Sequence, residues 1–179
     1  MKRIILILVL SFVAFGCKAQ TVVSQTKASG KNIVYTNSGK VEKTGRIIVS
    51  NEKNKLQVVK PYFPPAAGDI PDISIVKLDK IKLADILLGA FSVNRLKQVE
   101  NEKDLSIFFY LSDRGDVLEV SFMADENTKI TARELEYIES RIKSDIRATF
   151  LKDYLRGSNY ISILRQANFS ELLKLKLAK

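Results

Sequence analysis

Two strand-like runs joined by a short turn constrain the fold of this chain more than any other feature. Residues 105–111 (Leu-Ser-Ile-Phe-Phe-Tyr-Leu) and 117–123 (Val-Leu-Glu-Val-Ser-Phe-Met) are rich in β-branched and aromatic side chains. The intervening Ser112–Asp116 has the sequence Ser-Asp-Arg-Gly-Asp, a composition typical of a hairpin turn. Apolar and other residues alternate in the second run, which predicts a sheet with one covered face.

The segment after this hairpin is predicted to supply the cover. Thr131-Ala-Arg-Glu134 matches a capping box, in which the Thr and Glu side chains satisfy free amides at the start of a helix. The apolar residues that follow recur at spacings of three and four and so share one helical face: Leu135, Ile138, Ile142, Ile146 and Phe150. We therefore expect a helix over 131–150 that packs on the hairpin. Gly157-Ser-Asn159 marks a turn, and the β-prone run 160–167 predicts a third strand.

The first part of the chain is β-prone. Four short runs, separated by turn residues, predict an antiparallel meander over residues 20–62: 21–24, 32–36, 45–50 and 55–59. Residues 60–71 hold all four prolines, which interrupt regular structure, so residues 63–83 are expected to form a loop or linker.

Two further segments complete the expected order. Residues 84–99 have apolar residues close to helical spacing and are predicted to form a helix. Residues 170–177 allow two interpretations, a short helix capped by Ser170 or an edge strand of alternating Leu and Lys. The prediction is an α+β protein, in which the meander precedes an α-β-β-α-β unit over residues 84–179. Its helices should cover one face of a small antiparallel sheet.

This element order, with its Asp-Arg-Gly-Asp turn and capped helix, resembles the C-terminal domain of TonB-type energy-transducing proteins. Those proteins keep an uncleaved membrane anchor and a long proline-rich spacer, which this sequence does not show, so their function is not carried over. The chain also resembles small uncharacterised secreted proteins of Bacteroidota, through Val120–Met123, Thr131–Leu135 and Gly157–Tyr160. The second resemblance covers more of the chain and implies no known activity.

The N-terminus has the pattern of an export signal. Lys2 and Arg3 give it a positive start, and residues 4–15 are apolar apart from Ser11, a run of the length found in signal-peptide cores. We therefore expect residues 1–19 to be a signal peptide and the mature protein to reside in the periplasm or at the outer membrane.

Two cleavage sites fit this signal, and both remain open. Residues 14–17 (Ala-Phe-Gly-Cys) resemble a lipobox, after which Cys17 would be the acylated first residue and the only attachment to a membrane. Residues 17–19 (Cys-Lys-Ala) equally resemble an ordinary small-x-small site, with cleavage after Ala19.

Composition excludes several classes of function. The formal charge is +9. Removal of Lys2 and Arg3 lowers it to +7, and removal of Lys18 as well lowers it to +6. These basic residues are interleaved with acids rather than clustered, so no nucleic-acid partner is expected. The chain has no His and one Cys, which excludes His-dependent nucleophilic sites and zinc held by His or several Cys. We predict no cofactor.

The hairpin carries the one acidic cluster of the sequence: Asp113, Asp116, Glu119, Asp125 and Glu126. Its spacing matches no calcium loop, and Asp with Gly is also what a turn requires, so we interpret the cluster as structural and predict no metal site. No pair of carboxylates stands out as a general acid with its partner base.

These observations favour a non-enzymatic binding or structural module of the cell envelope. Its predicted last strand offers an unpaired edge, carried by Tyr160, Ile161, Ser162, Ile163 and Leu164, to which a partner could add a strand. The partner could be an envelope protein or a glycan, and the sequence sets no oligomeric state. The competing hypothesis is a carboxylate-dependent hydrolase that acts on a polysaccharide or cell-wall substrate.

Overall fold

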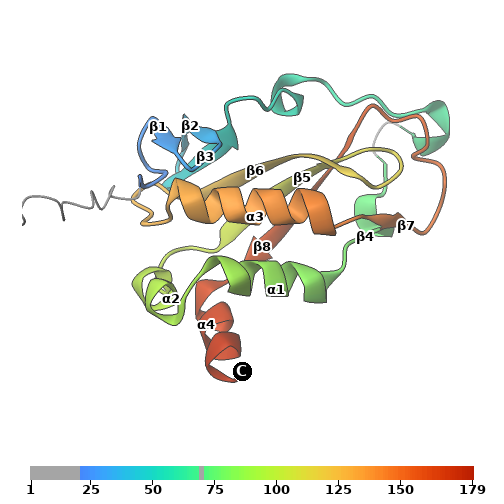
Figure 1. Cartoon of the computed structure of the whole chain (residues 1–179). Coiled ribbons are helices and arrows are strands. Elements are labelled where there is room, and N and C mark those ends of the chain that lie inside the picture. The colour runs from blue at the N-terminus through green and yellow to red at the C-terminus, as the bar shows by residue number, and fades with distance from the viewer. Residues whose placement is uncertain (1–20, 69–70) are drawn as a thin grey trace, which may run out of the picture.

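A six-stranded antiparallel sheet forms the centre of the molecule, in a computed structural model that describes residues 21–68 and 71–179 (Figure 1). The strand order is β1-β2-β3-β6-β5-β8. These strands are β1 (Lys27–Ser29), β2 (Val34–Val41), β3 (Arg46–Asn51), β5 (Leu105–Leu111), β6 (Val117–Asp125) and β8 (Ile161–Ala167). The fold is α+β, as predicted, and because β3 pairs with β6 the meander and the later unit share one sheet.

Four helices accompany the sheet in the described residues: α1 (Lys80–Ala90), α2 (Val93–Val99), α3 (Ala132–Asp145) and α4 (Phe169–Leu177). Figure 1 shows α3 and α1 side by side in front of the sheet, with α4 next to α1 and α2. Two short strands, β4 (Val76–Lys77) and β7 (Thr149–Phe150), pair with each other outside the main sheet.

The hairpin of β5 and β6 forms as predicted and supplies the centre of the core. Ile107 and Phe109 of β5 and Val120 and Phe122 of β6 are all fully buried. In the turn, Gly115 has φ +91°, a conformation that glycine adopts without strain. A Cβ atom at this position would lie 2.1 Å from the carbonyl oxygen of Ala148, so the close approach of two chain segments also requires glycine.

Helix α3 begins at the predicted capping box and packs through the predicted face. Leu135, Ile138 and Ile142 are at most 1% exposed. The helix ends at Asp145 rather than at residue 150, because Ile146 is extended and the amide of Ala148 donates to the carbonyl of Gly115. Departure from the helix thus brings the chain back to the hairpin turn.

The single helix predicted over residues 84–99 is two helices. Helix α1 starts earlier, at a cap in which Asp79 accepts from the amide of Lys82, and ends before Phe91. Ser92 then caps α2 by accepting from the amide of Arg95. At the break between the helices, the ring of Phe91 packs edge-on against that of Phe169 of α4, with centroids 5.7 Å apart.

Two of the four strands predicted for the meander are absent. Residues 21–24 make only an isolated bridge between Val22 and Thr131. Residues 55–59 contain a 3-10 turn, η1 (Leu56–Val58), because the carboxylate of Glu119 accepts from the amides of Lys55 and Leu56 and curls the chain there. The meander therefore consists of β1, β2 and β3.

The remaining segments follow the predictions in part. The expected linker over residues 63–83 holds two 3-10 turns, η2 (Pro65–Ala67) and η3 (Ile73–Ile75), then β4 and the first turn of α1. The segment left open at the C-terminus is helical, and its cap is Asn168 rather than Ser170. The Asn168 side chain accepts from the amide of Glu171 at 3.0 Å.

Candidate functional site

The predicted partner strand is β8, and it occupies one end of the sheet. One side of β8 pairs with β5, from Leu105 opposite Ala167 to Leu111 opposite Ile161. Among the described residues, no backbone hydrogen bond outside the sheet ladder involves residues 161–167. The outer edge of β8 is thus free of backbone partners within that part of the chain.

The five residues predicted to carry this edge have different environments. Ile161 and Ile163 are buried and point into the core, whereas Ser162 and Leu164 are exposed. Tyr160 lies just before the strand. Its ring packs against Tyr110 at 5.6 Å, and its hydroxyl donates to the carbonyl of Val59, so it anchors the start of β8. Burial raises the pKa of both tyrosines.

A groove of about 660 Å³ lies along the β8 edge, between the strand and residues 72–80. The buried Ile163, Val76 and Leu78 contribute its apolar lining. Its polar lining residues are Asp72, Ser74, Lys77, Lys80 and Arg165. Ile73 adds an exposed side chain to the apolar lining. Sequence analysis missed the side of the groove that faces β8, because residues 72–80 meet Ile163 and Arg165 only in the folded chain.

Positive charge dominates this groove. Lys77, Lys80 and Arg165 contribute three cations, and Asp72 contributes the single carboxylate. Hydrogen bonds from Ser74 lower the pKa of Asp72, which keeps it ionised. The groove therefore carries an excess of two positive charges beside a free strand edge, a combination suited to an extended polypeptide with acidic side chains.

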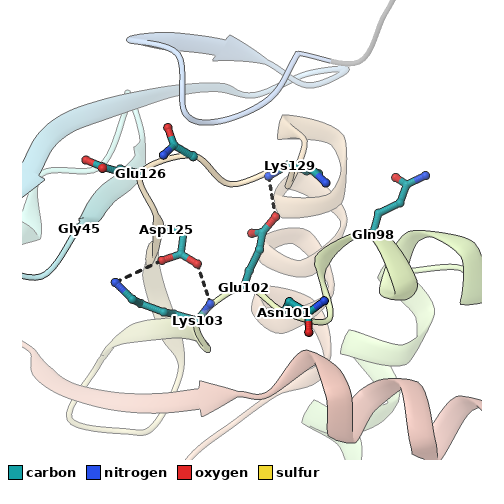
Figure 2. Close-up of a pocket in the computed structure, with 9 residues that line it drawn as sticks. Gly45, Gln98, Asn101, Glu102, Lys103, Asp125, Glu126 and Lys129 are labelled. Atoms are coloured by element: carbon teal, nitrogen blue, oxygen red, sulfur yellow. Dashed lines mark hydrogen bonds and ion pairs between the residues drawn. The ribbon is translucent and has the colours of Figure 1, made fainter.

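A second hollow, of about 420 Å³, gathers polar side chains at the end of β6 (Figure 2). Its lining includes the carboxylates Glu102, Asp125 and Glu126, with Lys103 and Lys129. A hydrolase would need two carboxylates that face one concavity. This hollow is the candidate for such a site, because three carboxylates line it.

Each of these carboxylates is engaged in holding a loop. Glu102 accepts from the Thr128 hydroxyl at 2.5 Å and from the Lys129 amide at 2.9 Å. Asp125 accepts from the Lys103 amide at 2.6 Å. Glu126 pairs with the ammonium group of Lys40, also at 2.6 Å. All three carboxylates are thus engaged in contacts within the protein, so the hollow does not single out a general acid and its partner base.

The acidic cluster of the hairpin divides in the structure: Asp125 and Glu126 line the second hollow, and the other three members have separate partners. Asp113 accepts from the amide of Gly157, Asp116 pairs with Arg147, and Glu119 holds the amides of residues 55 and 56. Within residues 21–68 and 71–179, no three or more Asp, Glu, His or Cys side chains are arranged so that they could hold a metal ion. Cys17, the predicted lipid attachment site, lies outside the described residues.

Sequence analysis also missed a polar network inside the core. Glu139 of α3 is fully buried and accepts from the Tyr35 hydroxyl at 2.7 Å and from the Asn51 amide group at 3.2 Å. Lys143 reaches the same carboxylate at 2.8 Å from one helical turn away. Burial and the neighbouring Glu139 raise the pKa of Tyr35. The network has no opening to solvent at Glu139, and it joins α3 to β2 and β3.

Comparison with known proteins identifies a related fold and no activity. No family model matches the chain, and no curated protein matches it. The crystal structure of a DUF5043 family protein from Bacteroides uniformis ATCC 8492 is similar, with a TM-score of 0.66 and 20% sequence identity. The match covers 84% of this chain and 89% of that chain. The two proteins share a fold. Within the part of the chain that the structure describes, every helix is too short or too polar to cross a membrane.

Proposed function

We propose that this protein is an exported, non-enzymatic binding module of the cell envelope that takes an extended segment of a partner protein along β8. The observation that carries the proposal is the edge strand without outer backbone partners beside a cationic groove of about 660 Å³. Strand addition draws its affinity from main-chain hydrogen bonds and its specificity from pockets for alternate side chains. Acidic residues in the partner segment would complement Lys77, Lys80 and Arg165.

The cell-envelope location rests on the N-terminal pattern, with its charged start, apolar core and cleavage motif. The mature protein should begin at Cys17 or at Gln20. Intact mass of the protein from fractionated cells distinguishes these two starts. Acyl labelling that disappears in Cys17→Ser would establish the lipid anchor, and an unprocessed cytosolic protein would overturn the location.

The binding test uses a photo-crosslinking amino acid placed at Lys77 or at Arg165, with the same group at Glu42 as the matched control. Glu42 is exposed between β2 and β3, near the opposite edge of the sheet. Crosslinking in intact cells, followed by mass spectrometry of the adduct, should identify one partner segment from the first two positions and not from the third.

The segment so identified is then synthesised and titrated into the purified protein. Strand addition should protect amides of residues 161–167 from hydrogen exchange and leave those of β1 unchanged. A peptide with a proline at its centre should bind more weakly because it loses a ladder donor. Adducts at Lys77 without any new protection in β8 would contradict strand addition. Cleavage of a glycan in a parallel screen would instead favour the hydrolase.

A further inference from the structure

A third hollow, of about 570 Å³, lies over the solvent-facing side of α3 and differs from the β8 groove in chemistry. It is lined by Lys31, Arg133, Glu136, Tyr137, Ser140 and Arg141. Arg133, Tyr137 and Arg141 are spaced by four residues, which places them in a row along one helix face. Lys31 reaches the same hollow from the turn before β2.

The cations of this hollow outnumber its carboxylates. The single acid, Glu136, is 9% exposed, and its oxygens accept from the Asn32 amide and the Asn32 side chain, both at 2.9 Å, and from the Lys31 amide. Arg141 pairs with Asp145 at 2.5 Å. The side chains of Lys31 and Arg133 make no hydrogen bond or ion pair with any other described residue, so two cations beside the hollow are free to meet an anion.

An aromatic ring stands among these charges. Tyr137 is 42% exposed, and its hydroxyl end lies over α1 at Gly89, where a Cβ atom would approach the Tyr137 oxygen to 2.5 Å. The missing side chain at Gly89 thus gives the ring its position. Most of the hollow's lining is carbon, from this ring and from the aliphatic stems of the charged residues. A ligand here should therefore have an apolar face as well as negative charge.

We propose that this hollow binds an anionic saccharide, a sugar that carries a carboxylate or a sulfate group. The acid group would pair with Arg133 and Lys31, the C–H face of the sugar ring would pack on Tyr137, and a ring hydroxyl would meet Ser140. A neutral sugar would leave both free cations unused, and a small inorganic anion would leave the carbon lining unused. The proposal goes beyond the proposed function and does not depend on the β8 groove.

The test compares a galacturonate trisaccharide with the uncharged galactose trisaccharide by calorimetric titration of the mature protein. The uronate should bind at least about tenfold more tightly, since each charge-assisted hydrogen bond is worth roughly a tenfold to hundredfold change. Arg133→Gln should lower the affinity by a similar factor. Arg114→Gln, which removes an exposed arginine in the hairpin turn, is the matched control and should leave affinity unchanged.

Three results would overturn the proposal. They are equal binding or no binding of the two trisaccharides, equal loss in Arg133→Gln and Arg114→Gln, and inorganic sulfate binding as tightly as the uronate. Tyr137→Leu distinguishes a saccharide site from a site for any small anion, because the variant should bind the uronate more weakly and inorganic sulfate equally well. Its melting temperature is measured alongside, since Tyr137 contacts α1. Lys77→Gln, in the β8 groove, should leave saccharide binding unchanged.

Discussion

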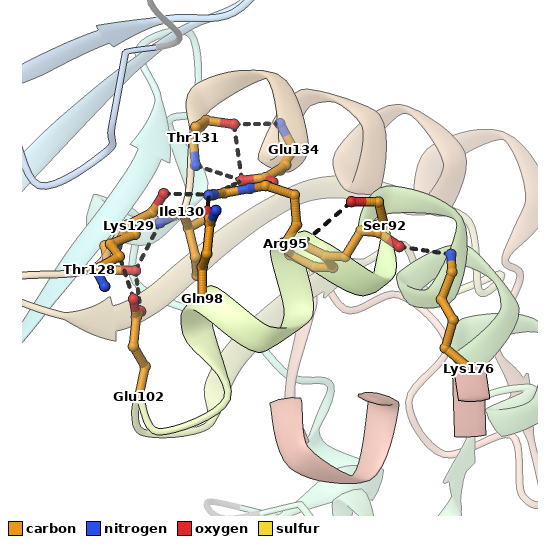
Figure 3. Close-up of polar contacts among 11 residues, drawn as sticks. Ser92, Arg95, Gln98, Glu102, Thr128, Lys129, Ile130, Thr131, Glu134 and Lys176 are labelled. Carbon is orange, nitrogen blue, oxygen red and sulfur yellow. Dashed lines mark hydrogen bonds and ion pairs between the residues drawn. The ribbon is translucent and has the colours of Figure 1, made fainter. Parts of the chain in front are cut away.

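The guanidinium group of Arg95 donates to both oxygens of the Glu134 carboxylate, through Nε at 2.7 Å and Nη2 at 3.1 Å (Figure 3). Arg95 belongs to α2 and Glu134 to the capping box of α3, so a side chain of α2 binds the first turn of α3. Nη2 also donates to the carbonyl of Lys129 at 2.8 Å, which ties in the loop before α3. The Glu134 carboxylate raises the pKa of Arg95.

Removal of the Glu134 carboxylate should therefore destabilise the protein more than the loss of a cap alone. Glu134→Ala deprives Arg95 and the amide of Thr131 of their acceptor, and we expect a loss of about 1.5–3 kcal/mol in the free energy of unfolding. Urea denaturation measures this loss. Glu134→Gln should cost less, because Gln can still complete a capping box. Glu171→Ala is the control: Glu171 holds the same position in α4 and its side chain is exposed, so it should change stability by less than about 0.5 kcal/mol.

The buried face of α3 gives a second prediction. Ile142 is fully buried, so Ile142→Ala should cost about 2–5 kcal/mol through lost transfer energy and the cavity left behind. Thermal and urea unfolding of the variant provide the measurement. Leu175→Ala, at a helix position that is 51% exposed, is the comparison and should have a much smaller effect. An unchanged melting curve for Ile142→Ala would mean that α3 packs through another face.

Gly115 and Gly39 separate backbone strain from steric overlap. Both have positive φ, +91° and +102°, but a Cβ atom at Gly39 would meet nothing within 4 Å, whereas one at Gly115 would overlap the carbonyl of Ala148. Gly39→Ala should thus cost roughly 1 kcal/mol from strain alone. Gly115→Ala should cost clearly more, since the hairpin turn must also move away from Ala148. Equal costs by urea denaturation would contradict the close approach.

The buried hydroxyl of Tyr35 should make the protein less stable to unfolding at high pH. Burial and Glu139 raise its pKa above the ordinary value of 10.0, so on titration the unfolded chain releases this proton first. The contribution of the neutral hydroxyl is complete below pH 10 and decreases above it, by up to about 1.4 kcal/mol per pH unit. The stability difference between wild type and Tyr35→Phe should stay constant up to pH 10 and shrink beyond it. Urea titrations from pH 8 to 11 test this, and a constant difference throughout would refute it.

Local signals predicted the elements that depend on local contacts. The turn at Gly115, the cap at Thr131 and the buried face through Ile142 are set by residues within one or two turns of each other, and all three are present in the structure. Asp79 and Ser92 were equally local signals, because each is a favourable N-cap residue. Asp79 marks the earlier start of α1, and Ser92 marks the division of the segment 84–99 into two helices.

The errors arose where distant residues determine the structure. The strand predicted at residues 55–59 is absent because Glu119, 63 residues later than Leu56, accepts the amides that a strand would need. The β8 edge was predictable from the order of elements, but its groove depends on Lys77 and Arg165, which only the fold brings together. The hollow over α3 likewise combines Lys31 with Arg133, and its aromatic ring depends on Gly89 in another helix.

The pairing of β3 with β6 has a consequence for how the chain folds. Residues 46–50 reach their partners only at residues 121–125, so the middle of the sheet closes a long loop of chain. Contacts between residues so far apart in the sequence form late, and they lower the folding rate. The reason is that the chain loses loop-closure entropy before the pairing compensates for it. A chain that emerges N-terminus first, from a ribosome or through a translocation pore, therefore presents β3 with one side unpaired until residue 125 has followed. During that interval β3 is open to pairing with the wrong chain.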